Sequence, residues 1–144
     1  MGVVSGRDRL RRVLLALGVI VTVFGVLHHV DHVVRGNHSG WPFREAVTPF
    51  TFSLLVYALL LPGIYMNLRG RVAAGWWVFT ASVALALVVL VHFLGGDREA
   101  PLRDIYAVYG SPVAGLAALV VLAGLLAGLS ALLISALGAL RRRT

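Results

Sequence analysis

Four long apolar stretches, separated by short polar segments, dominate the pattern of residues along the chain. They run approximately over residues 10–34, 48–68, 72–94 and 112–140. Because about 20 apolar helical residues cross the hydrocarbon core of a bilayer, each stretch predicts one membrane-spanning helix. The sequence therefore predicts an all-α integral membrane protein: a four-transmembrane-helix bundle with short loops, forming a single domain over residues 1–144.

Local signals mark where some of these helices begin or bend. Thr48 and Ser111 each stand directly before a proline, Pro49 and Pro112. A hydroxyl residue followed by proline is typical of a helix N-cap and first helical position. Pro62 lies inside the second stretch, where it predicts a kink.

Small and aromatic residues suggest how the helices pack. Gly124 and Gly128 form a GxxxG pair in the fourth stretch, which favours close helix approach. Packing within the chain and self-association of two copies are both open. Trp76 and Trp77 fall near the predicted inner boundary, where an aromatic belt is expected.

Composition agrees with a membrane location. Apolar residues make up 59% of the 144 residues and charged residues 13%, whereas soluble proteins carry about 25% charged residues. The four stretches take up most of the chain and leave no room for a separate soluble domain. The chain has no cysteine, which excludes thiolate metal sites and a cysteine nucleophile.

The net charge of +7 comes from arginine, and its placement indicates topology rather than nucleic-acid binding. On one side of the predicted membrane lie Arg7, Arg9, Arg11, Arg12, Arg69, Arg71, Arg141, Arg142 and Arg143. The other side holds Arg35, Arg44, Arg98 and Arg103, together with four acidic residues. Because positive residues collect on the cytoplasmic side, we expect a multi-pass protein of the cell membrane with both termini in the cytoplasm.

One cluster of ionisable residues is not explained by membrane insertion. His28, His29, Asp31 and His32 lie at the end of the first stretch, and His92 lies near the end of the third. Ionisable groups in a span are costly and are usually kept for function or for buried pairing. His28 and His32 share one helix face, since they are four residues apart. Histidines at this spacing can bind one metal ion together.

The depths of these histidines in the membrane also agree. At 1.5 Å per residue, His28 lies about 27 Å along the helix from Leu10, and His92 about 30 Å from Val72. If the first and third helices are neighbours, His28, His32 and His92 converge near the outer leaflet. We expect Asp31 to act as a fourth ligand or to orient a ligating imidazole. His29 and His38 are weaker candidates for metal ligands, and Glu99 or Asp104 can close the site.

Three functions remain open from the sequence. In the first, the histidines bind copper, zinc or iron, for metal handling, for redox chemistry or for assembly of a larger membrane complex. In the second, His92 and either His28 or His32 are axial ligands of a b-type haem (haem b), whose propionates meet arginines of the outer loops: Arg35, Arg44 or Arg98. In the third, the chain is a non-catalytic subunit whose histidines tune an interface.

A structural explanation of the cluster stands beside these functions. Asp31 and Arg35 are spaced for a helical ion pair, and the histidines can form a polar network. No nucleophile elbow, phosphate-binding loop or HExxH motif occurs. The sequence leaves open whether the protein is an enzyme, and whether it forms a homo-oligomer or joins a larger membrane complex. Besides the lipid bilayer it indicates no partner, and no nucleic acid.

Overall fold

The described part of the protein is helical. The computed structural model describes residues 6–34, 52–94, 106 and 108–142. Within them, the helices are α1 (Gly6–Val34), α3 (Val56–Leu68), α4 (Ala74–Val89), the π-helical turn η1 (Leu90–Leu94) and α6 (Pro112–Arg141). Three helical segments are long and apolar enough to cross a membrane: α1, α4 continued by η1, and α6. The fourth helix, α3, has 13 residues, a length of about 20 Å.

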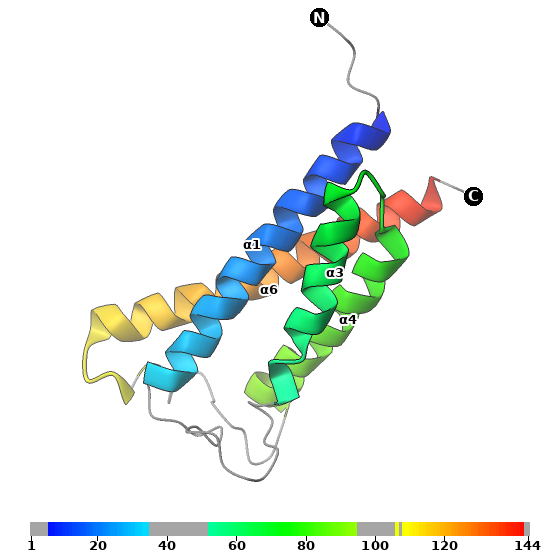
Figure 1. Ribbon diagram of the computed structural model, residues 1–144. Coiled ribbons are helices and arrows are strands. Elements are labelled where there is room, and N and C mark those ends of the chain that lie inside the picture. Colours follow the sequence, from blue (N-terminus) through cyan, green and yellow to red (C-terminus); the bar gives the residue numbers. More distant parts are fainter. Residues whose placement is uncertain (1–5, 35–51, 95–105, 107, 143–144) are drawn as a thin grey trace, which may run out of the picture.

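The helices form a bundle in which α1 and α4 face each other across the centre. α1 packs against α6 and α3, and α4 packs against the same two helices. The start of α1, the turn between α3 and α4, and the end of α6 all lie at one end of the bundle (Figure 1). Because α4, which η1 continues, lies diagonally across the bundle from α1, His92 reaches His28 and His32 from the opposite side of the bundle and not from a neighbouring helix.

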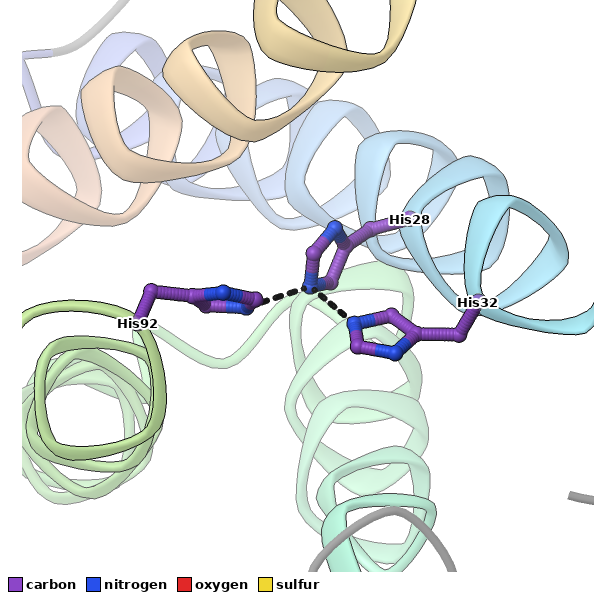
Figure 2. Close-up of side chains that lie close together, drawn as sticks. All are labelled: His28, His32 and His92. Carbon is purple, nitrogen blue, oxygen red and sulfur yellow. Dashed lines mark hydrogen bonds between the residues drawn. The ribbon is translucent and has the colours of Figure 1, made fainter. Parts of the chain in front are cut away.

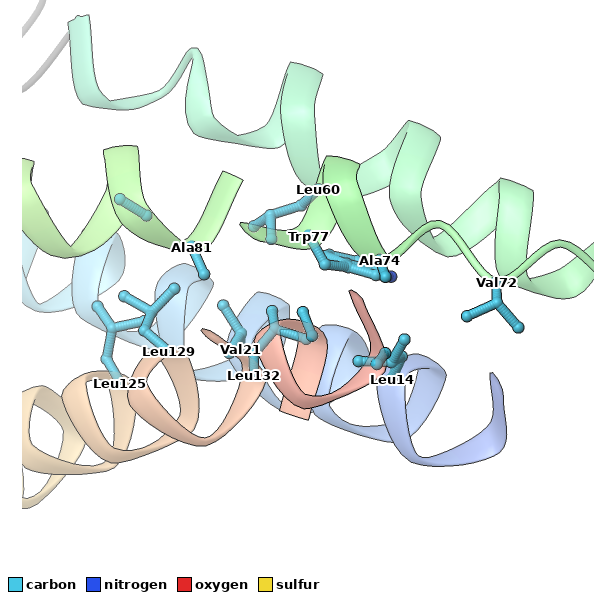
Figure 3. Close-up of a cluster of buried hydrophobic side chains, with 13 residues drawn as sticks. Leu14, Val21, Leu60, Val72, Ala74, Trp77, Ala81, Leu125, Leu129 and Leu132 are labelled. Atoms are coloured by element: carbon cyan, nitrogen blue, oxygen red, sulfur yellow. The ribbon is translucent and has the colours of Figure 1, made fainter. Parts of the chain in front are cut away.

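Trp77 of α4 fills the bundle centre at this end. Its side chain is 0% exposed, and it lies within the cluster of buried apolar side chains in Figure 3. Gly18 of α1 and Gly63 of α3 border the indole, because a Cβ atom on either glycine would lie 2.6 or 2.8 Å from Trp77 Cη2. The expectation that Trp77 belongs to an interfacial belt is thus wrong. The absence of side chains at the two glycines leaves the space that the Trp77 ring occupies in the core.

Asn67 ties three helices together beside Trp77. The Trp77 indole N–H donates to Asn67 Oδ1 at 3.2 Å. The Asn67 amide donates to the Arg11 carbonyl at 3.2 Å, and Arg11 Nη1 donates to the Asn67 carbonyl at 3.0 Å. Asn67 is fully buried, and a buried amide is stabilising only when it is hydrogen-bonded. These bonds therefore connect α1, α3 and α4 at a single residue.

Replacing Asn67 by leucine is expected to lower the free energy of unfolding by about 1–3 kcal/mol, because the buried Trp77 N–H loses its acceptor. Unfolding of the purified protein in lipid bicelles measures the change. Thr80→Val is the matched control, since the buried Thr80 hydroxyl has no hydrogen-bond partner among the described residues. The control is expected to be neutral or stabilising. Equal losses in the two variants would contradict a specific role for Asn67.

Several local signals in the sequence have structural counterparts. Ser111 is the N-cap of α6, its Oγ accepts from the Ala114 backbone N–H at 3.5 Å, and Pro112 is the first helical residue. Pro62 lies inside α3. Pro62 has no N–H to donate to the carbonyl four residues before it, that of Ala58. The next carbonyl, that of Leu59, accepts a hydrogen bond from the Trp76 indole N–H at 2.7 Å. The predicted helix start at Thr48 and Pro49 lies outside the described residues.

The GxxxG pair of α6 faces α1 of the same chain. A Cβ atom on Gly124 would lie 2.4 Å from the Phe24 ring, and one on Gly128 would lie 3.2 Å from Val21. Both glycines therefore permit α1 and α6 to approach closely. Of the two packing roles left open by the sequence, the pair is used in packing within the chain.

Candidate metal-binding site

Three histidines meet in the interior of the bundle. His28 and His32 come from α1 and His92 from η1, and they are 6%, 4% and 3% exposed. His28 Nε2 lies 3.1 Å from His92 Nε2 and 3.2 Å from His32 Nε2. Figure 2 shows the three rings pointing toward one another, with His28 at the centre. The predicted convergence of these residues is confirmed.

The local backbone explains how two of the rings come from one helix and the third from another. His28 and His32 are one helical turn apart on α1 and so project from the same face. His92 lies in η1, where a π-helical turn continues α4. Its i→i+5 bonds widen the turn and change the direction of the side chains relative to a regular α-helix. Such turns are frequent at functional sites. The apolar sequence around His92 does not itself predict a π-helical turn.

The nitrogen positions are close to those of ligands around one ion. Metal–nitrogen bonds of about 2.0–2.1 Å in a tetrahedral site separate the ligating nitrogens by about 3.3 Å. Two of the separations here are 3.1 and 3.2 Å, and one nitrogen from each ring lies within 4.8 Å of the other two.

Asp31 is held by a different partner. Its carboxylate is buried and accepts a hydrogen bond from the Tyr109 hydroxyl. This contact joins α1 to the segment that precedes α6. Among the described residues, the group with metal-binding geometry comprises the three histidines and does not include Asp31. Because Tyr109 is far from Asp31 in the sequence, only the tertiary structure identifies it as a partner.

His29 points toward α3 and away from the other three histidines. Its Nδ1 lies 2.8 Å from both the Gly25 carbonyl and the Tyr57 hydroxyl, and its Nε2 lies 2.8 Å from Ser53 Oγ. The His29 ring thus connects α1 to α3 through Tyr57, and to the residues just before α3 through Ser53. The i, i+4 spacing of Ser53 and Tyr57 in an apolar stretch is a signal that sequence reasoning missed.

The remaining candidates lie outside the described residues. These are His38 as a weaker ligand, Glu99 and Asp104 as residues that close the site, and Arg35, Arg44 and Arg98 as propionate partners.

An apolar cavity lies next to the three histidines. Its volume is about 390 Å³, and its walls come from all four helices of the bundle. The polar residues in these walls are His28, His29, His32, Ser53 and His92, and all the others are apolar or glycine. The candidate site thus combines three converging imidazoles with an apolar chamber.

Comparison of the chain with protein-family models, with curated proteins and with solved structures finds no match. In the described residues, the fold and the site define an all-helical bundle with apolar helices of membrane-spanning length and a buried group of three histidines close enough to bind a metal ion.

Proposed function

We propose that this protein spans the membrane four times, with both termini in the cytoplasm, and binds one transition-metal ion through His28, His32 and His92 near the outer leaflet. Three helical segments have the length and apolar character of spans, and α3 together with the apolar residues before it supplies the fourth. The arginines near the ends of α1 and α6, and those in the α3–α4 turn, support this topology.

The meeting of three Nε2 atoms at His28 is the observation that carries the proposal. A ring nitrogen either bears one hydrogen or offers one lone pair. His28 Nε2 therefore cannot form two good hydrogen bonds at once, although it lies within 3.2 Å of two other ring nitrogens. A metal ion at the centre satisfies all three lone pairs together. Burial strengthens the argument, since polar groups placed in a span are costly.

The ligand set indicates which ions fit and what they do. Neutral imidazoles suit zinc, copper and iron, and the chain has no cysteine to supply a thiolate. A tetrahedral ion held by three protein ligands keeps one position open, as catalytic zinc sites do. The proposed role is therefore metal handling or redox chemistry, and not a closed structural site.

A haem between the same residues fits less well. Two axial imidazoles place their nitrogens on opposite faces of the macrocycle, with about 4 Å between them. The 3.1 Å between His28 Nε2 and His92 Nε2 leaves no room for a macrocycle between the rings. An ion requires a small adjustment of the rings, whereas a haem requires that α1 and η1 move apart.

The test is elemental analysis combined with a visible spectrum, on protein purified through a tag that does not bind metal. We expect one zinc, copper or iron per chain and no Soret band. After the native metal is removed with a chelator, one added cobalt(II) per chain is expected to give the visible absorption bands of a tetrahedral cobalt site. A stoichiometric Soret band would support the haem instead. Protein that carries no metal and takes up no cobalt would support a non-catalytic subunit whose histidines form a polar network.

A further inference from the structure

The cavity beside the histidines is large and apolar, and some of its lining residues are exposed. A volume of 390 Å³ corresponds to about 13 water molecules at about 30 Å³ each. Ordered water needs two to four polar partners per molecule, and most of this wall is leucine, valine and alanine. The lining therefore suits a hydrocarbon group.

The polar atoms of the wall are gathered at the histidine site. His28, His32 and His92 all line the cavity, so an ion that they hold would lie at its wall. The other two polar residues of the wall, His29 and Ser53, are hydrogen-bonded to each other at 2.8 Å. A largely apolar ligand in the cavity would thus find one place that can bind a polar group at its end, namely the three-histidine site.

We infer that the cavity binds a lipid-soluble molecule with one hydrocarbon chain and an oxygen-bearing head group, and that the head-group oxygen takes the fourth position on the ion. This assignment rests on the proposed metal site. The hydrocarbon chain of this ligand fills the apolar cavity, and its head-group oxygen binds the metal at the cavity wall. The volume lies in the range of about 300–1,000 Å³ that is usual for small-molecule pockets.

The cavity opens on faces that meet lipid in the proposed topology. Phe52 and Leu55, which precede α3, are 51% and 60% exposed, and Val83 of α4 is 37% exposed. All three line the cavity. α3 and α4 are connected by a short turn at the other end of the bundle (Figure 1). A molecule dissolved in the bilayer thus reaches the histidines sideways, without crossing water.

Stearate spin-labelled near its carboxyl group is a suitable probe, with the protein in phosphatidylcholine nanodiscs. The zinc-loaded protein is expected to give one immobilised probe per chain in the electron paramagnetic resonance spectrum, with affinity about 10-fold or more above that of the metal-free protein. Unlabelled stearate is expected to shift the visible bands of the cobalt-loaded protein, because its carboxylate becomes a ligand.

The Ala84→Leu variant tests the cavity independently of the metal site. Ala84 is buried on α4 and lines the cavity, so a larger side chain occupies the space of the ligand. We expect stearate affinity to fall about 10-fold or more and cobalt binding to persist, which also shows that the variant folds. Ala86→Leu is the matched control, an exposed position on the same helix outside the cavity. Ala58→Phe adds bulk at an exposed cavity position and is expected to act like Ala84→Leu.

The outcomes distinguish this inference from the proposed function. Cobalt binding without a spectral shift on addition of stearate, or stearate binding that is unchanged in both Ala84→Leu and Ala58→Phe, overturns the inference and leaves the metal site intact. Failure to bind cobalt at all overturns the metal site, and with it the assigned role of the head group.

Discussion

Replacing His28 by alanine is expected to lower the affinity of the protein for cobalt(II) and zinc(II) by about 100-fold or more. Loss of residues that merely support a metal ligand already costs about 10–100-fold, so loss of a ligand costs at least as much. His28 is the central residue, because its Nε2 lies 3.1 and 3.2 Å from those of His92 and His32. Titration of the chelated protein with cobalt, followed by visible absorption, measures the affinity.

Two further variants make this result specific. His92→Ala is expected to give a loss of similar size from η1, a segment remote from His28 in the sequence. His29→Ala is the matched control, since His29 is next to His28 but hydrogen-bonds toward α3. It is expected to retain one cobalt per chain. A protein that binds cobalt equally well with and without His28 and His92 would show that these histidines form a structural network.

Replacing Gly18 by leucine is expected to lower the free energy of unfolding by about 3 kcal/mol, the upper part of the range for an overpacked core. The indole of Trp77 would lie 2.6 Å from a Cβ atom at Gly18, and Gly63 borders the same ring from α3. The ring is fully buried and cannot move away from α1 without meeting α3. Unfolding by guanidinium in lipid bicelles measures the loss.

A control and a double variant identify the cause of this loss. A Cβ atom at Gly138 of α6 meets no other atom within 4 Å, so Gly138→Leu is expected to be neutral or slightly stabilising through its better helix propensity. In the Trp77→Ala background, Gly18→Leu is expected to cost much less than it does alone, because the clash is removed. Additive losses in the double variant would contradict steric conflict with Trp77.

The helical framework and the site differ in how far they follow from the sequence. Apolar length predicts α1, α4 with η1, and α6, because the thickness of the hydrocarbon core sets the length of a span. The spacing of His28 and His32 predicts a shared face, and counting along two helices predicts that His92 lies at the same depth. These predictions depend on the rise and the turn of one helix at a time, which are nearly constant.

The orientation of each helix about its own axis depends on its neighbours. His29 and Asp31 are adjacent in sequence to His28 and His32, yet His29 faces Ser53 and Tyr57. Asp31 is bound by Tyr109. Trp77 is drawn into the core by two glycines on other helices, although its position along the chain is typical of an interface.

The sequence alone determined that the chain is built of apolar helices and that three histidines stand at one level, since both properties follow from distances along a helix. The tertiary structure decided that α1 and α4 lie opposite each other, that a π-helical turn carries His92, and that a cavity adjoins the three rings. These features arise from side-chain packing between helices. Residue spacing within a single helix does not record how its faces meet those of its neighbours.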